Sequence, residues 1–191
     1  MKFLNKKELQ KKFRLKFLNR NALITYHPEI TEHNSSVKGI KELLLALKKF
    51  SGTLKIFTAA NSDEGGKKIN QIIKRFVKFK KNNSIFLPSV GSRNYLSFLN
   101  NVDFVIGNSS SGISEAPSFG IGTINIGNRQ KGRLMASSVL NTKANKTSIV
   151  KTINKIYEKS FKQKLKKTIN PYEKKNTLKK IIKILNKKNF K

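Results

Sequence analysis

The chain contains no cysteine, few acidic residues and no long apolar run. The absence of cysteine excludes a disulfide framework and a thiolate metal site, and it is compatible with a reducing compartment. No window approaches the ~18 apolar residues of a membrane span, and the first residues lack the apolar core of a signal peptide. We therefore expect a cytoplasmic protein that does not contact membranes, and we expect neither a metal nor another cofactor.

The scarcity of acidic residues leaves a large positive charge, because 10 Asp and Glu stand against 41 Lys and Arg, for a net charge of +31. Such an excess usually indicates nucleic acid or an anionic membrane as partner. Here, however, most of the basic residues are lysines scattered among Asn and Ile, arginine is scarce, and no RNA-binding aromatic signature or zinc spacing is present. These features favour solvated lysine faces over a specific nucleic-acid surface, with weak nonspecific binding at low salt.

Short apolar runs alternate with helical patterns along most of the chain. The runs predict strands at 22–26, 54–58, 84–87, 103–106 and 123–126. A 3.6-residue apolar spacing predicts helices at 37–50, 63–80, 94–100 and 110–119, after a Lys-rich helix or linker at 6–19. This alternation predicts βαβ crossovers, and hence an α/β fold: a Rossmann-like parallel sheet with helices on both faces.

The C-terminal part of the chain differs from the rest, because three Lys-rich helical segments follow one another at 147–159, 160–167 and 174–188. A chain of 191 residues is long enough for one core and a tail. We expect an N-terminal linker or helix at 1–20, a Rossmann-like domain at 21–142, and C-terminal helices at 143–191 that pack on that domain.

The most informative stretch is Phe104–Glu115, which changes within twelve residues from a buried-strand pattern to a hydroxyl-rich turn and a helix. The first turn of a helix leaves N–H groups unpaired and carries about +0.5 elementary charge, so it stabilises an anion. Two glycines would let a ligand approach the backbone, and three serines would add donors for a diphosphate. An ordinary capped helix start contains the same residue types.

Several polar residues come directly after predicted strands. In parallel sheets ligands bind outside the carboxyl ends of the strands, so a single crevice is expected to collect these residues. His27 before Pro28 would equally suit a strand end with no ligand. The residues in question are His27, Asn61, Val90, the turn at 107–112 and Arg129.

Four local patterns occur in order: Tyr-His-Pro at 26–28, Asn-Ser-Asp-Glu-Gly-Gly at 61–66, the serine-rich turn at 107–117, and Asn-Ile-Gly-Asn-Arg-Gln-Lys-Gly-Arg at 125–133. Together they resemble the C-terminal half of the UDP-N-acetylglucosamine 2-epimerases, from about residue 8 to about residue 185. The serine-rich loop is similar to the hydrolysing branch, since the non-hydrolysing branch carries Asp-Ser-Gly-Gly there. The resemblance implies the second Rossmann-like domain of a GT-B-type fold.

The resemblance also implies roles for particular residues in a UDP site. A charged guanidinium fork suits phosphate oxygens, and a carboxylate suits vicinal hydroxyls. The implied contacts are Ser109 and Ser110 with the diphosphate, Glu115 with the ribose hydroxyls, Val90 with uracil through its backbone, and His27, Asn61 and Arg129 completing the UDP site.

The implied reaction converts UDP-N-acetylglucosamine and water into N-acetylmannosamine and UDP, by elimination of UDP and hydration of the resulting glycal. His27 is the catalytic candidate, because an imidazole can donate a hydrogen bond or a proton to the departing diphosphate. The carboxylates needed for the steps at the sugar belong to the family's N-terminal domain. The implied partners are therefore UDP-N-acetylglucosamine or UDP and a complementary N-terminal domain chain, in a homo-oligomer when complete, serving sialic-acid-like sugar synthesis.

Three alternatives stay open at this level. The first is a sugar-nucleotide-binding module without catalysis, and the second is a basic nucleic-acid-binding protein. The third is an enzyme for a GDP-linked substrate, because the serine loop is expected to contact phosphate and not the base. The sequence also departs from the family pattern: Ala59-Ala60 precede Asn61 where a proline is expected, Gly122 stands where a second proline is expected, and 173–175 replaces a glycine-containing turn. These departures alter loops and leave the implied nucleotide contacts in place.

Overall fold

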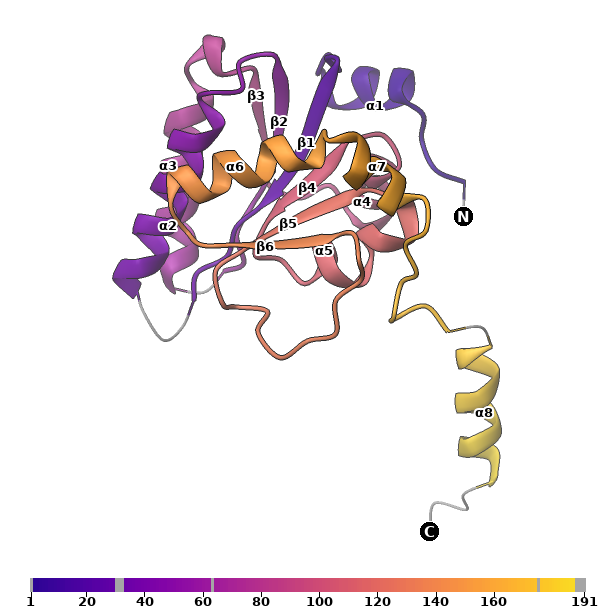
Figure 1. Ribbon diagram of the computed structural model, residues 1–191. Helices are drawn as coiled ribbons and strands as arrows, with labels where there is room; N and C mark the ends of the chain where they lie inside the picture. Colours follow the sequence, from indigo (N-terminus) through magenta and orange to yellow (C-terminus); the bar gives the residue numbers. More distant parts are fainter. Residues whose placement is uncertain (1, 30–32, 63, 175, 188–191) are drawn as a thin grey trace.

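A six-stranded sheet forms the centre of the protein, in which every hydrogen-bonded pair of strands is parallel. The computed structural model describes residues 2–29, 33–62, 64–174 and 176–187. The strands are β1 (Arg20–Thr25), β2 (Thr53–Thr58), β3 (Ser84–Leu87), β4 (Phe104–Gly107), β5 (Gly122–Ile126) and β6 (Val139–Thr142). Their order across the sheet is β3-β2-β1-β4-β5-β6 (Figure 1), which is that of the doubly wound nucleotide-binding folds. The predicted fold class is confirmed.

Helices cover both faces of this sheet (Figure 1). They are α1 (Lys6–Phe13), α2 (His33–Leu47), α3 (Glu64–Val77), α4 (Ser92–Leu99), α5 (Ser111–Ser114), α6 (Lys146–Ile156), α7 (Lys159–Leu165) and α8 (Thr177–Lys187), with 3₁₀ turns η1 (Lys80–Asn82) and η2 (Ala116–Phe119). Ala22 and Ile24 of β1 pack in the hydrophobic cluster that includes α2, α3 and α6, whereas Leu23 packs in the cluster that includes α1 and α4. This alternation follows from the two-residue period of a strand, and it explains why three consecutive residues of β1, Ala22, Leu23 and Ile24, are all apolar.

Two elements differ from the predictions. The structure adds β6, which the sequence pattern did not reveal because this four-residue edge strand pairs only with β5 and none of its residues is fully buried. The helix predicted at 110–119 is divided into α5 and η2. The division follows from Pro117, which has no N–H to donate and whose ring disfavours helical backbone in the residue before it.

The C-terminal helices fall into two groups. Residues of α6 and α7 are buried in the core, including Ile149, Ile153 and Phe161. In contrast, Figure 1 shows α8 apart from the sheet, and its apolar side chains Leu178 and Ile181 are exposed. The expected packing of C-terminal helices on the domain is therefore seen for α6 and α7 but not for α8. The domain boundaries stay a prediction. Within the described ranges, no helix has the length and apolar character needed to cross a membrane.

Lys55 of β2 is fully buried at the amino end of the sheet. Its Nζ donates to three backbone carbonyl oxygens, those of Phe50 at 2.8 Å, Thr53 at 3.0 Å and Asn82 at 2.7 Å. Burial lowers the pKa of Lys55 to about 8. The side chain thus ties the start of β2 to the segment before β3.

This lowered pKa predicts a stability that rises in mild alkali. Between about pH 8 and the ordinary lysine pKa of 10.5, the unfolded chain binds more protons at this position than the folded chain does, so raising the pH favours folding. We expect the free energy of unfolding to rise by about 1–2 kcal/mol between pH 7.5 and 9.5. Urea unfolding of wild type and Lys55→Met over this range tests it, since the variant should lack the rise. Equal pH dependence in both proteins would contradict the prediction.

Candidate nucleotide-binding site

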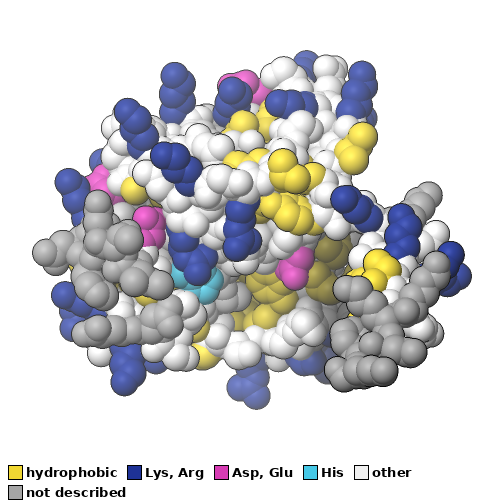
Figure 2. Space-filling model, turned by 90° about the horizontal axis from the view of Figure 1, so that it is seen from below, with side chains coloured by type: hydrophobic (Ala, Val, Ile, Leu, Met, Phe, Trp, Pro, Cys, Tyr) yellow, Lys and Arg dark blue, Asp and Glu magenta, His cyan; other side chains and the backbone are white. Residues whose placement is uncertain are grey.

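The candidate site lies where the direction of winding changes in the sheet. From β1 the chain crosses to β2 on one side, whereas from β4 it crosses to β5 on the other, and β1 and β4 are neighbours. Parallel sheets bind ligands at the carboxyl ends of the strands flanking such a switch point. His27 follows β1 and Ser109 follows β4. Figure 2 shows the lower face of the molecule, where a histidine and an acidic side chain flank a hollow and Lys and Arg surround it.

Hydrogen bonds of Asn108 join the segment after β4 to the segment after β1. Its Oδ1 accepts from the backbone N–H of His27 at 2.7 Å, and its Nδ2 donates to the His27 carbonyl oxygen at 2.9 Å. Its own N–H donates to the carbonyl oxygen of Thr25 at 3.2 Å. The Asn108 side chain is fully buried and extends the pairing of β1 and β4 by one residue. This contact sets the position of His27.

Two residues after β5 bind the same asparagine. Arg129 Nη1 donates to the Asn108 carbonyl oxygen at 3.1 Å, and Gln130 Nε2 donates to it at 2.7 Å. The backbone N–H of Asn61 donates to His27 Nδ1 at 3.1 Å. The structure therefore brings three of the predicted residues, His27, Asn61 and Arg129, together around Asn108. Because Nδ1 of His27 is an acceptor, Nε2 is the ring nitrogen that carries hydrogen.

The two glycines of the turn are required by the packing of the chain, while the approach of a ligand to their backbone stays a prediction. Gly107 has φ +145°, and a Cβ there would lie 1.9 Å from the carbonyl oxygen of Thr25. A Cβ on Gly112 would lie 2.8 Å from Cγ2 of Thr123. Each glycine therefore faces a neighbouring strand, β1 or β5, where no side chain fits.

The serine turn presents hydroxyl and N–H donors from a very short helix. α5 has only four residues, so its dipole is smaller than a continuous helix over 110–119 would provide. No hydrogen bond from the backbone N–H of Ser109 or Ser110 to another described residue is seen. The hydroxyl of Ser111 pairs with that of Tyr95, and Ser114 Oγ donates to the carbonyl oxygen of Ser110 at 3.0 Å. Anion binding here would therefore depend on individual donors.

A cavity of about 340 Å³ adjoins this turn and contains two of the predicted residues, Val90 and Glu115. Tyr95 also lines it, so the hydroxyl that contacts Ser111 connects the cavity to the serine turn. Asn94 Nδ2 donates to the carbonyl oxygen of Val90 at 2.6 Å and fixes the orientation of that peptide. Partial burial raises the pKa of Glu115. This cavity combines an apolar wall with one carboxylate, as the nucleoside end of a nucleotide requires.

Three residues that support the site were not singled out from the sequence: Asn108, Gln130 and Tyr95. Asn108 stands inside the serine-rich motif, but only the β1–β4 pairing shows that its side chain points back to His27. Gln130 lies next to Arg129 and is 2 % exposed, which no local pattern predicts. Among the described residues no group of three or more His, Asp or Glu side chains is placed to hold a metal ion.

Comparison with known sequences identifies the family. The sequence model of the family described as UDP-N-acetylglucosamine 2-epimerase matches residues 2–186. The chain belongs to the UDP-N-acetylglucosamine 2-epimerase family. The predicted family resemblance is thus confirmed over nearly the whole chain.

Two relatives of this epimerase-family chain align with most of it but with less than half of their own length. It is 40% identical over 163 residues to the Campylobacter jejuni protein named GDP/UDP-N,N'-diacetylbacillosamine 2-epimerase (hydrolyzing). This alignment covers 85% of this chain and 42% of that protein. It is 39% identical over 158 residues to the Escherichia coli polysialic acid biosynthesis protein P7, covering 82% and 40%. The chain therefore spans less than half the length of these relatives.

A solved structure supports the fold of this family member. The Neisseria meningitidis UDP-GlcNAc 2-epimerase, crystallised with UDP-GlcNAc bound, superimposes with a TM-score of 0.68 over 96% of this chain and 48% of that chain. The identity between the two is 16%, so the similarity concerns the fold. It places the six-stranded sheet in the GT-B-like epimerase architecture.

Proposed function

We propose that this chain is the nucleotide-binding half of a hydrolysing UDP-N-acetylglucosamine 2-epimerase, which forms N-acetylmannosamine and UDP from UDP-N-acetylglucosamine and water. The observation that carries the proposal is the cluster around Asn108, where His27, Asn61 and Arg129 meet at the switch point of the sheet. The names of the relatives support the hydrolysing reaction and the place in sialic-acid-like sugar synthesis. The cytoplasm is the proposed location.

The nucleoside would occupy the cavity lined by Val90 and Glu115. There the backbone of Val90 contacts uracil, and the carboxylate of Glu115 accepts hydrogen bonds from the two ribose hydroxyls. Charge-assisted hydrogen bonds of this kind are stronger than those between neutral groups. Tyr95, whose hydroxyl pairs with Ser111, separates the ribose from the diphosphate turn.

The diphosphate would lie on Ser109 and Ser110, whose hydroxyl and N–H groups are donors at the end of β4. Arg129 adds a positive charge, and its bond to the Asn108 carbonyl leaves other guanidinium N–H groups to bind phosphate oxygens. These groups neutralise the charge that grows on the diphosphate as it leaves, which is the contribution this half makes to the reaction.

His27 would donate a hydrogen bond from Nε2 to the departing diphosphate. Nδ1 accepts from the Asn61 N–H at 3.1 Å, which fits a hydrogen bond donated by Nε2. The carboxylates that remove the C2 proton and hydrate the glycal would come from the complementary N-terminal domain, within a homo-oligomer. We therefore expect weak UDP binding and negligible turnover from this chain alone.

Binding and turnover test the proposal separately. UDP titrated into the ¹⁵N-labelled chain should shift backbone signals of 107–115, and N-acetylmannosamine should form only when the complementary domain is added. UDP binding without product in the presence of that domain would favour a non-catalytic sugar-nucleotide-binding module. Binding to RNA or DNA that UDP does not compete would favour a nucleic-acid-binding protein.

The identity of the base is a separate question, because one relative is named for both GDP- and UDP-linked substrates. The groups proposed to hold the diphosphate and ribose do not distinguish the two nucleotides. Competition between UDP and GDP for the labelled chain decides it. We expect UDP to bind more tightly, and tighter GDP binding would replace the proposed substrate with its GDP-linked counterpart.

Replacing Glu115 with glutamine should weaken nucleotide binding by about tenfold, since a charge-assisted hydrogen bond contributes about 1.5–3 kcal/mol. The raised pKa also predicts a pH dependence: binding of UDP-N-acetylglucosamine is strongest above this pKa and weakens as the pH falls through it. Titrations of wild type and Glu115→Gln at several pH values measure both effects. Glu158→Gln, at an exposed glutamate before α7, is the control. Equal affinity of Glu115→Gln and wild type would exclude the ribose role.

A further inference from the structure

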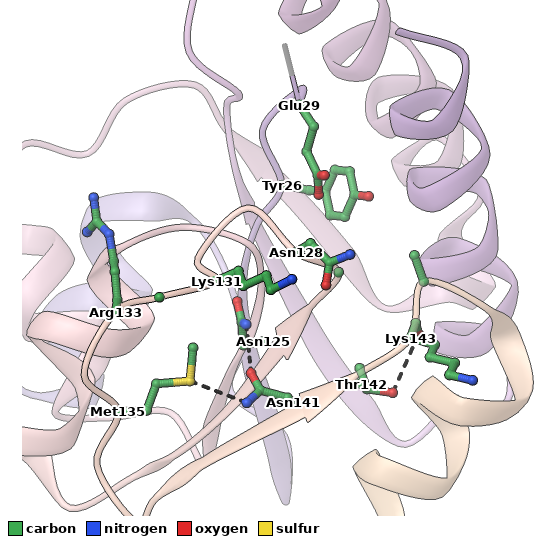
Figure 3. A pocket seen from close by; sticks show the side chains of 13 residues that line it. Tyr26, Glu29, Asn125, Asn128, Lys131, Arg133, Met135, Asn141, Thr142 and Lys143 are labelled. Carbon is green, nitrogen blue, oxygen red and sulfur yellow. Dashed lines mark hydrogen bonds between the residues drawn. The ribbon is translucent and has the colours of Figure 1, made fainter. Parts of the chain in front are cut away.

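Residues 168–173, between α7 and α8, form neither a helix nor a strand, and we call them the strap (Figure 1). The hydroxyl of Thr168 pairs with that of Ser137 at 3.1 Å. The hydroxyl of Tyr172 donates to the carbonyl oxygen of Leu134 at 3.0 Å. Both partners belong to the loop between β5 and β6, which borders the cavity of about 720 Å³ drawn in Figure 3. The strap is therefore fixed on this loop near both of its ends.

Asn170, in the middle of the strap, is 7% exposed. Its Nδ2 donates to the carbonyl oxygen of Ser114 at 2.8 Å and to Oγ of Ser118 at 2.7 Å. Its Oδ1 accepts from the backbone N–H of Tyr172 at 3.0 Å. Only the oxygen of the amide can accept that bond, so the N–H groups of the amide face Ser114. The strap thus carries a buried donor with a fixed orientation.

The carbonyl oxygen of Ser114 needs such a donor, because the two usual ones are not available to it. Ser114 is the last residue of α5, where carbonyl groups lose their partners along the chain. Three residues further on, Pro117 has no N–H. Four residues further on, the N–H of Ser118 donates to the carbonyl oxygen of Glu115 at 3.0 Å instead. Asn170 therefore replaces the bond that a continuing helix would make.

This carbonyl group belongs to the peptide that joins Ser114 to Glu115. The N–H of the same peptide donates to the carbonyl oxygen of Ser111 at 2.9 Å. A peptide is planar, so the bond from Asn170 fixes its second side and with it the direction in which the Glu115 side chain leaves the backbone. Glu115 lines the cavity of about 340 Å³, whereas no residue of the strap does. Asn170 can therefore act on a ligand in that cavity only through Glu115.

We propose that Asn170 is a positioning residue, which holds the carboxylate of Glu115 in place for the ribose hydroxyls of the nucleotide. The inference rests on the proposed function, because that function assigns the ribose to Glu115. Two hydrogen bonds from vicinal hydroxyls require both carboxylate oxygens to face the ribose at once. Binding geometry of this kind is lost with displacements of about 0.5 Å, which a rotation of the preceding peptide would produce.

The backbone amide signal of Glu115 tests the contact without a nucleotide. Asn170→Ala removes the donor, and Asn170→Asp keeps the acceptor for the Tyr172 N–H but places an oxygen against the Ser114 carbonyl oxygen. In the ¹⁵N-labelled 191-residue chain, both variants should shift this signal, because the hydrogen bond is made to the same peptide. Asn154→Ala, at an exposed position on α6, should not shift it. An unchanged Glu115 signal in both Asn170 variants would overturn the inference.

A double-mutant cycle tests the action of Asn170 on the ribose. We expect Asn170→Ala to weaken UDP binding about fivefold in the wild-type background and by less than about twofold in Glu115→Ala, where the carboxylate to be positioned is missing. Asn170→Asp should behave in the same way, and it carries the test if Asn170→Ala does not fold. An equal loss in both backgrounds, or no loss in either, would show that Asn170 does not act through Glu115.

Failure of this inference and failure of the proposed function give different results. If Glu115→Ala weakens UDP binding but the effect of Asn170→Ala is the same in both backgrounds, only the positioning role of Asn170 is overturned. If Glu115→Ala binds UDP as tightly as wild type, the ribose role of Glu115 is wrong and this inference falls with it. If wild type does not bind UDP, the proposed function itself is overturned.

Discussion

Asn108→Ala should destabilise the protein by about 2–4 kcal/mol and weaken UDP binding by about tenfold. The substitution removes the two side-chain hydrogen bonds to the backbone of His27, at 2.7 and 2.9 Å. The N–H and carbonyl of His27 both lose the Asn108 side chain as a partner beside a fully buried position, and a lost partner of this kind costs about 1–3 kcal/mol per group. Urea unfolding measures the stability, and titration with UDP measures the affinity.

A second variant separates the lost hydrogen bonds from the lost volume. Asn108→Asp keeps the Oδ1 acceptor but places a carboxylate oxygen against the His27 carbonyl oxygen. This variant should therefore be less stable than wild type, although its side chain has the same size as that of Asn108. Asn154→Ala, an exposed asparagine of α6, should change stability by less than about 0.5 kcal/mol. If both Asn108 variants matched this control, Asn108 would not be the residue that joins β1 to β4.

Gly107→Ala should destabilise the protein by about 3 kcal/mol or more, or prevent folding. The residue has φ +145°, and the added Cβ would lie 1.9 Å from the carbonyl oxygen of Thr25, which belongs to the backbone of β1 and cannot rotate away as a side chain would. The clash between this Cβ and the Thr25 carbonyl oxygen can be relieved only if β1 and β4 separate at the switch point. The expected loss of stability therefore comes with a loss of the site, measured as the yield of folded protein and the urea midpoint.

Gly52→Ala is the matched control for this change. Gly52 lies in the turn before β2, and a Cβ there meets no atom within 4 Å. Alanine at such a position reduces the entropy of the unfolded chain, so this variant should be neutral or more stable by up to about 1 kcal/mol. A Gly107→Ala protein as stable as Gly52→Ala would show that the backbone at the end of β4 is not constrained as described.

Most of the sheet could be predicted because its strands are buried on both faces. β1, β2, β4 and β5 each contain a short cluster of apolar residues, and the predicted strands at these positions lie within two residues of the observed ones. β6 could not be found in this way, because an edge strand with one neighbour does not need such a run. The break between α5 and η2 was foreseeable from Pro117, since proline acts on the backbone locally.

The sequence by itself determined the alternation of strands and helices, the family pattern and the residues that follow each strand, because these depend on local periodicity and on short motifs. Only the tertiary structure decided how those residues meet. The hydrogen bonds from Asn108 to His27, the close approach of Gly107 to Thr25 and the contact of Asn170 with the carbonyl oxygen of Ser114 join segments far apart in the chain. Such contacts depend on the strand order and on which side chains face each other, neither of which has a local signal in the sequence.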